Sequence, residues 1–220
     1  MRTKQELALL HEASLVCART LIFLMVEMKD RLNNAQDVLM ARVVSNFVLL
    51  LLKKNQSEQF LSLMYALLQY FTVTFSKPLF SQETPYCGDL TFELMRHCNF
   101  RSAKTRGEAA GCLYLFYKTC WQVNKNLLRM KLQSSVALAK LVGDSSIRRS
   151  RLLESGLKNI VKFSATDKEM DSTFKAELED LLAQRLSQIL ANVNKLEKWQ
   201  HDPEMYADVM YETSLGWRDR

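Results

Sequence analysis

The sequence predicts an all-α fold, an irregular antiparallel helix stack of the armadillo-like α-solenoid type. Its 220 residues include only six glycines and three prolines, so turns are scarce and long helices are favoured over many short strands. Apolar side chains recur at three- and four-residue spacing, which gives each helix one apolar side. Such helices become stable by packing on one another, and a hydrophobic content of 48% supplies the core. Because no repeat consensus recurs at a fixed period, we expect irregular stacking.

The N-terminal part of the chain predicts three helices. The first covers residues 5–31 and the second covers residues 35–53. Asn55 and Glu58 have the spacing of a capping box, so we expect a third helix to begin there. It should end before Pro78, because the residue that precedes a proline disfavours the helical conformation.

The middle of the chain begins with a predicted helix over residues 89–98. Thr105 and Glu108 form a second capping-box spacing, and the helix that follows them carries one apolar stripe. That stripe consists of Leu113, Phe116, Tyr117 and Cys120. Gly107 and Gly111 have a GxxxG spacing, which outside a membrane span indicates only close helix packing.

The next two predicted helices lie on either side of Gly143. The first has an apolar stripe, and Gly143 suits its C-terminal stop. The stripe consists of Leu128, Leu132, Val136, Ala139 and Val142. Ser145 can cap the second helix, which we expect to reach residue 163.

The polar segment 166–172 is the best candidate for a domain boundary. It would separate a helical region, residues 1–165, from a second region, residues 171–220. The second region opens with a helix of nearly thirty residues and a long apolar stripe. The stripe consists of Phe174, Leu178, Leu182, Ile189, Val193 and Leu196. It could pack inside the monomer or pair with a second copy of the chain, and packing inside the monomer is the interpretation we favour.

Charge is distributed unevenly along the chain. Residues 96–162 hold fourteen basic and three acidic side chains, a net charge of +11, whereas residues 163–220 hold seven basic and twelve acidic ones. The basic region could attract acidic partners, or it could be a solvated face. The side chains of the candidate basic face are Arg96, Arg101, Lys104, Arg106, Arg148, Arg149 and Arg151.

We predict no catalytic, cofactor-binding or metal-binding residues. The sequence has neither a CxxC nor an HExxH pattern, and its three histidines are not arranged as a base beside a nucleophile. The five cysteines have no framework spacing, which indicates free thiols in a reducing compartment. The charged start is not a secretory signal, and the longest apolar run, residues 43–52, is too short to span a membrane. We therefore expect a cytoplasmic protein.

Three blocks of sequence carry a resemblance. They are ELMRHCNFRSAKTRGEAAGCLYLFYK at 93–118, LLRMKLQSSVALAKLVG at 127–143 and DPEM at 202–205, which is followed by Asp208, Met210, Tyr211 and Gly216. In order and spacing they resemble the DOCK (dedicator of cytokinesis) guanine nucleotide exchange factors, with the zizimin-like C and D branches nearest. Residues 171–220 resemble the start of the DOCKER region, its N-terminal lobe only. The chain ends shortly after Trp217, so we expect a fragment or a truncated product.

The resemblance implies a function for a longer parent protein. That protein would release GDP from a Rho-family GTPase of the Rac or cell-division-control type, and homodimerisation would involve the N-terminal lobe of its DOCKER region. The catalytic lobes lie downstream of the DPEM helix in the family, so the chain itself is not expected to be an enzyme. The alternative is an unrelated α-solenoid that binds acidic protein, RNA or anionic lipid through residues 96–162. Nucleic acid and membrane surfaces are not the partners that we expect.

Overall fold

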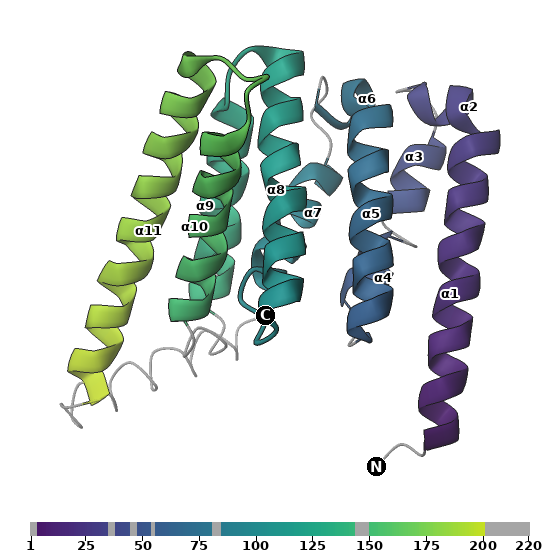
Figure 1. The fold of residues 1–220 in the computed structure, drawn as a ribbon, viewed down its shortest axis with the longest axis horizontal. Helices are drawn as coiled ribbons and strands as arrows, with labels where there is room; N and C mark the ends of the chain where they lie inside the picture. Colours follow the sequence, from purple (N-terminus) through teal and green to yellow (C-terminus); the bar gives the residue numbers. More distant parts are fainter. Residues whose placement is uncertain are drawn as a thin grey trace, which may run out of the picture.

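The computed structural model describes residues 4–34, 38–44, 48–53, 56–80, 85–143 and 150–200 (Figure 1). These residues form helices with no strand among them, which confirms the all-α prediction. The helices are α1 (Lys4–Glu27), α2 (Lys29–Asn33), α3 (Val38–Val43), α4 (Leu49–Lys53), α5 (Glu58–Thr74), α6 (Ser76–Phe80), α7 (Pro85–His97), α8 (Ala103–Asn124), α9 (Leu128–Gly143), α10 (Ser150–Thr166) and α11 (Ser172–Gln200).

The long helices α1, α5, α8 and α10 form a row in which all run in the same direction (Figure 1). Near the start of α5, the Ser62 hydroxyl donates to the Glu108 carboxylate of α8 at 2.7 Å. Near the end of α5, Val73 lines the same groove as Thr119 of α8. Early residues of one helix thus meet early residues of the next, so α5 and α8 are parallel.

The helices α7, α9 and α11 run in the opposite direction. The Lys140 Nζ of α9 lies 5.9 Å from the centre of the Phe92 ring of α7, and an Arg185 guanidinium nitrogen of α11 donates to the Lys131 carbonyl oxygen at 3.3 Å. Among them, α7 and α9 return the chain toward the starts of the row helices α8 and α10, and α11 packs on α10 (Figure 1). This arrangement confirms the predicted antiparallel, solenoid-like stack.

Aromatic side chains fill the space between the helices. Phe174 of α11 packs against Trp121 of α8 with ring centroids 5.7 Å apart, and the Phe80 ring of α6 meets the Phe116 ring of α8 edge-on at 5.5 Å. Burying each such ring removes enough apolar surface from water to contribute about 2–3 kcal/mol. The largest fully buried side chains include Phe60, Tyr65, Phe71, Phe75, Phe80, Phe116, Tyr117 and Phe174.

Serine side chains cap the starts of two row helices. The Ser57 hydroxyl accepts from the backbone N–H of Phe60 at 3.2 Å at the start of α5, and the Ser102 hydroxyl accepts from the N–H of Thr105 at 3.3 Å at the start of α8. The predictions of Asn55 and Thr105 as the capping residues are therefore wrong. Asn55 lies outside the described residues, and Thr105 is already inside its helix. Serine is as good a capping residue as the asparagine or threonine that was predicted, because its hydroxyl accepts a hydrogen bond from one of the free backbone N–H groups in the first turn of the helix.

Several predicted helix boundaries also differ from the structure. The segment predicted as one helix over residues 5–31 is divided into α1 and α2, and residues 35–53 contain α3 and α4. The helix α5 ends at Thr74, before Pro78 as predicted, and Pro78 lies inside the separate short helix α6. The described part of α9 ends at Gly143, α10 extends to Thr166, and residues 144–149, which include Ser145, lie outside the described residues.

The predicted apolar stripe of α9 is on the wrong face. Leu128, Leu132 and Val136 are 72%, 61% and 41% exposed, and Ala139 is exposed as well. The side chain of Val142 lies outside the described residues. A second stripe on the same helix is buried and consists of Met130, Ala137, Leu138 and Leu141. Both stripes have helical spacing, so periodicity alone could not choose between them.

The GxxxG glycines of α8 do not mark a close helix contact. A Cβ atom added at Gly107 would meet no other atom within 4 Å, and one at Gly111 would meet only the Phe163 ring at 3.9 Å, an ordinary contact. The inference of close packing from this spacing is therefore wrong.

One described helix has the length and composition of a membrane span. Residues 8–27 of α1 have a mean hydropathy of 1.7, and 22% of the most apolar window is buried inside the structure. This window lies outside residues 43–52, the longest apolar run, which is too short for a span. Core helices of soluble proteins and signal sequences share this composition, so the feature does not by itself define a membrane protein.

Candidate functional site

Arg96, the first residue of the candidate basic face, lies at the C-terminal end of α7. Its guanidinium pairs with the buried Glu93 carboxylate at 2.7 Å and donates to the Leu52 carbonyl oxygen at 3.0 Å. It also lies 5.9 Å from the centre of the Phe100 ring. This cation satisfies a main-chain carbonyl at the end of α4, so it ties α4 to α7.

Arg106 is likewise bound to the main chain. One terminal guanidinium nitrogen donates to the Phe100 and Arg101 carbonyl oxygens at 2.8 and 2.7 Å, which closes the turn between α7 and α8. Lys104 lies one turn from Glu108, with its ammonium 4.0 Å from that carboxylate. Two cations of the candidate basic face thus bind backbone carbonyls, and a third lies near a carboxylate.

The remaining basic side chains lie near the starts of α8 and α10. Arg101 and Arg151 are exposed, and both helices begin at the lower end of the stack in Figure 1. Arg148 and Arg149 lie outside the described residues. Within the candidate basic face, the described cations that face solvent without binding a carbonyl are therefore Arg101, Lys104 and Arg151.

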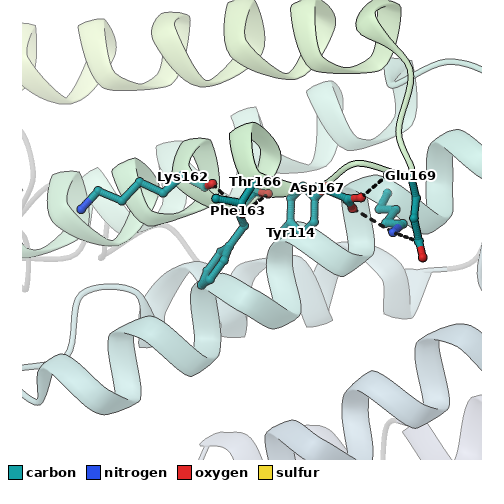
Figure 2. A network of polar contacts seen from close by, with 7 residues as sticks. Tyr114, Lys162, Phe163, Thr166, Asp167 and Glu169 are labelled. Carbon is teal, nitrogen blue, oxygen red and sulfur yellow. Dashed lines mark hydrogen bonds and ion pairs between the residues drawn. The ribbon is translucent and has the colours of Figure 1, made fainter.

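A polar network joins the turn between α10 and α11 to α8 at the opposite end of the stack (Figure 2). The Tyr114 hydroxyl donates to Asp167 Oδ2 at 2.7 Å, and the Lys118 ammonium donates to the same oxygen at 2.8 Å and to the Glu169 carboxylate at 2.7 Å. Asp167 Oδ1 accepts from the Glu169 backbone N–H at 2.8 Å. The network fastens the turn to the middle of α8.

The protonation states in this network follow from its geometry. The hydrogen bond from Lys118 is the main reason that the pKa of Asp167 is lowered to about 2, and the Tyr114 hydrogen bond adds to it. Burial raises the pKa of Tyr114, and the Asp167 carboxylate raises it further. At neutral pH the site is an ionised Asp167 held by a protonated tyrosine and an ammonium group. Such an arrangement stabilises a turn and holds no group poised for proton transfer.

His97 is buried between α4, α5 and α7. The Tyr65 hydroxyl lies 2.7 Å from His97 Nδ1, and His97 Nε2 lies 3.0 Å from the Leu52 carbonyl oxygen. Burial and the neighbouring Arg96 lower the pKa of His97 to about 4. The imidazole is therefore neutral, with Nε2 donating to the carbonyl and Nδ1 accepting from the tyrosine. Because it is 1% exposed, its role is to connect three helices.

The long stripe of α11 lies inside the stack over its described length. Phe174, Leu178, Leu182 and Ile189 are at most 2% exposed, and the Phe174 ring also lies 6.2 Å from the Tyr114 ring. The side chains of Val193 and Leu196 lie outside the described residues. Phe174 and Tyr114 therefore link the α11 stripe directly to the Asp167 network.

The described part of the chain contains no group of three histidine, cysteine or acidic side chains that could hold a metal ion. A groove of about 490 Å³ lies between the ends of α5 and α8 and is lined by Val73, Ser76, Lys77, Thr119, Gln122 and Val123. The buried Thr119 hydroxyl oxygen has no hydrogen-bond partner among the described residues. The groove lining includes no carboxylate, thiol or imidazole, so it lacks the groups of a catalytic pair.

Comparison with known proteins identifies several relatives of the chain. It is 33% identical over 165 residues to dedicator of cytokinesis protein 7 from human, a match that covers 74% of this chain and 8% of the relative. It is 32% identical over 208 residues to protein 6 from mouse, which covers 94% of this chain and 10% of the relative. The chain is homologous to the DOCK proteins.

This DOCK homologue is less similar to another member of the family. It is 24% identical over 205 residues to mouse dedicator of cytokinesis protein 9, which covers 91% of the chain and 10% of the relative. The chain spans about a tenth of the length of these curated relatives. Neither a family model nor a solved structure matches it.

Sequence reasoning did not identify the Asp167 network or the His97 cluster. In the sequence, the segment around Asp167 indicates only a polar boundary, and nothing in its spacing connects it to Tyr114, 53 positions earlier. The one available signal was Asp171, whose carboxylate accepts from the Phe174 N–H at 2.7 Å and caps α11.

Proposed function

We propose that this chain is a helical scaffold segment of a guanine nucleotide exchange factor for Rho-family GTPases of the Rac or cell-division-control type. Its homology to DOCK proteins over 94% of its length carries this proposal. The stack supports it, because rows of packed helices form a rigid support and the described residues present no catalytic arrangement.

The scaffold would act by fixing the direction of α11. In this proposal residues 171–220 begin the DOCKER region, and the catalytic lobes lie in the parent protein beyond this segment. The Asp167 network and the Phe174 contacts hold the first turns of α11 against α8. The parent would act in the cytoplasm and would contact its GTPase through those downstream lobes.

A nucleotide-release assay tests directly whether the chain has exchange activity. The chain is mixed with Rac-type and cell-division-control-type GTPases loaded with a fluorescent GDP analogue. We expect release at the intrinsic rate, because the segment has no catalytic lobe. Acceleration by the chain alone would overturn the proposal.

The scaffold role has a separate test in a chimera. The corresponding segment of mouse dedicator of cytokinesis protein 6 is replaced by this chain, with a second chimera carrying Asp167→Ala to release α11. We expect the first chimera to retain most of the parent's exchange rate and the second to lose much of it. A folded first chimera with no exchange, or two equally active chimeras, would contradict the scaffold role.

The alternative function, binding of acidic partners through residues 96–162, has less support. Arg96 and Arg106 bind carbonyl oxygens, and Lys104 lies beside Glu108. Binding of RNA or anionic vesicles that weakens steeply with salt, and that is lost on Arg101→Glu with Arg151→Glu, would favour this alternative over the scaffold.

A further inference from the structure

Apolar side chains lie exposed along one side of α9. Leu128, Leu132 and Val136 are 72%, 61% and 41% exposed, and Ala139 is exposed beside them. Their spacing places them on one side of the helix over about 16 Å at the helical rise per residue. We call these four residues the α9 outer face. Single exposed apolar side chains are ordinary on protein surfaces, but a contiguous row of them indicates a contact surface.

The α9 outer face lies on a lateral side of the stack rather than at one of its ends. The helix α9 packs against α7, α8 and α11, so it has neighbours on both sides within the stack. Helices in a solenoid contact their neighbours along the chain, so further helices stacked before α1 or after α11 would lengthen the stack without covering this side. An occupant of this face therefore comes from outside the stacked helices.

Two lysines border the α9 outer face. Lys131 and Lys140 are exposed, and neither forms an ion pair within the described part of the chain. The Lys140 ammonium lies over the Phe92 ring of α7, whereas the main chain of Lys131 contacts Arg185 of α11, so the lysines mark opposite edges of the face. The neighbouring helices carry exposed acids such as Asp89, but none of them pairs with either lysine. The face is thus apolar in the middle and cationic at both edges.

Arg185 is a buried cation with no anionic partner among the described residues. It is 4% exposed, and its terminal nitrogens donate to the Gln188 side chain at 2.7 Å and to the Lys131 carbonyl oxygen at 3.3 Å. Its Nε atom has no hydrogen-bond partner in the described part of the chain. Buried charges are normally paired, because their removal from water is strongly unfavourable. Gln188 is exposed, so a carboxylate arriving from solvent can replace its amide oxygen at the guanidinium.

We propose that the α9 outer face binds an acidic amphipathic helix of a partner protein. The apolar side of that helix covers the row from Leu128 to Ala139, its acidic side chains pair with the two bordering lysines, and one carboxylate binds Arg185 in place of Gln188. A helix of three or more turns spans the face. The contact is small, so the affinity is micromolar. None of the side chains of the candidate basic face takes part, and the binding is separate from the proposed scaffold role.

Other anionic partners fit the α9 outer face less well. A nucleic acid contacts proteins largely through its phosphates, which would leave Leu128 and Leu132 without an apolar surface to cover them. An anionic bilayer would cover both leucines, but it meets the side chains that project furthest, and Arg185 is recessed between α9 and α11. A carboxylate at the end of a side chain reaches a recessed guanidinium. Arg185 therefore favours a protein partner.

Fluorescence anisotropy with the whole chain and a labelled synthetic peptide tests the proposal. The peptide is an amphipathic helix of about fifteen residues built from glutamate and leucine, which is long enough to cover the face. A matched peptide carries lysine in place of glutamate. We expect saturable micromolar binding of the glutamate peptide and at least tenfold weaker binding of the lysine peptide. Absence of saturable binding, or equal binding of the two peptides, would overturn the proposal.

Leu132→Glu should weaken binding of the glutamate peptide at least tenfold, because it places a like charge in the middle of the apolar row. Val73→Glu is the matched control, since Val73 is 60% exposed on α5, close to the 61% of Leu132, and receives the same charge. Circular dichroism establishes that both variants are folded. Equal losses of affinity in the two variants would show that the peptide does not bind at α9.

Charge reversal tests the electrostatic part of the contact. Lys131→Glu combined with Lys140→Glu should reverse the preference, so that the lysine peptide binds more tightly than the glutamate peptide. Arg185→Gln should weaken the glutamate peptide at least fivefold, because the carboxylate loses its recessed partner. A retained preference in the double variant, or an unchanged affinity in folded Arg185→Gln, would contradict the proposed pairing.

Two further measurements distinguish other occupants. Vesicles that contain phosphatidylserine would identify a membrane contact instead if they bind the chain, lose this binding on Leu132→Glu and compete with no peptide. The chimera of mouse dedicator of cytokinesis protein 6 that carries this chain should bind the glutamate peptide as the chain alone does. A folded chimera that does not bind it would show that the parent itself covers the face. Leu132→Glu should leave the exchange rate of that chimera unchanged, so this proposal and the scaffold role fail separately.

Discussion

Gly156 of α10 packs directly against Cys98 at the end of α7. A Cβ atom at Gly156 would lie 2.6 Å from the Cys98 carbonyl oxygen and 2.8 Å from Cys98 Cβ. Both distances are shorter than a van der Waals contact, and the oxygen belongs to the backbone. Glycine at this position therefore lets α10 approach α7, and the neighbour cannot move aside as a flexible side chain could.

Gly156→Ala should lower the free energy of unfolding by roughly 1–3 kcal/mol, the usual cost of excess volume in a packed core. Gly107→Ala is the matched control. It adds the same methyl group in a helix where no atom lies within 4 Å, so it should raise stability by up to about 1 kcal/mol. Urea unfolding followed by circular dichroism measures both. Equal effects of the two substitutions would show that Gly156 does not mark a tight contact.

Asp167→Asn should lower the free energy of unfolding by roughly 1–3 kcal/mol, because it weakens hydrogen bonds from Tyr114 and Lys118 to a carboxylate. Both partners of the Lys118–Asp167 pair have side chains that are only 13% exposed. Glu169→Gln is the control, since the Glu169 side chain is 79% exposed and its pair with Lys118 contributes less than about 0.5 kcal/mol. Thermal unfolding that is more sensitive to Glu169→Gln would contradict the assignment.

The stability of the chain should decrease as the pH falls from 6.5 to 4. The pKa of His97 is about 4 in the folded protein and 6.5 in its ordinary state, so the unfolded chain binds one more proton in that interval. The loss attributable to His97 is about 1.4 kcal/mol per pH unit, or roughly 3 kcal/mol in total. Urea unfolding at a series of pH values measures this loss. His97→Gln should reduce the slope of the free energy of unfolding against pH by the equivalent of about one bound proton. An unchanged slope would rule out the neutral, buried imidazole.

Below pH 4 the Asp167 carboxylate should add a second loss. Its pKa is lowered to about 2, so its contribution is complete above its ordinary value of 3.8 and is lost as the pH falls toward 2. Asp167→Asn should remove that part of the acid dependence while leaving the part between pH 6.5 and 4 intact. The two variants thus separate the two titrations.

The native chain should have one readily modified thiol out of its five cysteines. Cys17 is half-buried, whereas Cys87, Cys98, Cys112 and Cys120 are buried. Burial raises the pKa of Cys87 to about 11 and that of Cys112 to about 12, so their thiolate forms are scarce at neutral pH. A thiol reagent such as Ellman's should react rapidly with one group, and Cys17→Ser should abolish the rapid phase. Rapid reaction of several thiols in the folded chain would contradict this packing.

The sequence was sufficient to predict the helical class and the stacking of antiparallel helices, because apolar periodicity is a local property. It could not choose between the two stripes of α9. Leu132 and Leu138 both lie at helical spacing from apolar neighbours, yet one is exposed by 61% and the other by 2%. Which stripe is buried depends on which side of α9 the neighbouring helices pack against, and this is decided by segments distant in the sequence.

The candidate basic face shows the same limit of the sequence, which does not reveal which basic side chains are free to bind a partner. Arg106 and Arg151 are equivalent as sequence letters, but Arg106 donates to two carbonyl oxygens of a turn and Arg151 is exposed. Free carbonyl groups at helix ends compete with any external partner for a nearby guanidinium. The predicted boundary between residues 165 and 171 remains a prediction.

Burial of the α11 stripe from Phe174 to Ile189 fixes the direction of this helix over much of its length. Its 29 residues extend about 43 Å from the turn that Asp167 holds. A tilt of about 10° at that turn would move the far end by about 7 Å. The buried stripe and the Asp167 network together therefore limit how far the C-terminal end of α11, the longest described helix, can swing.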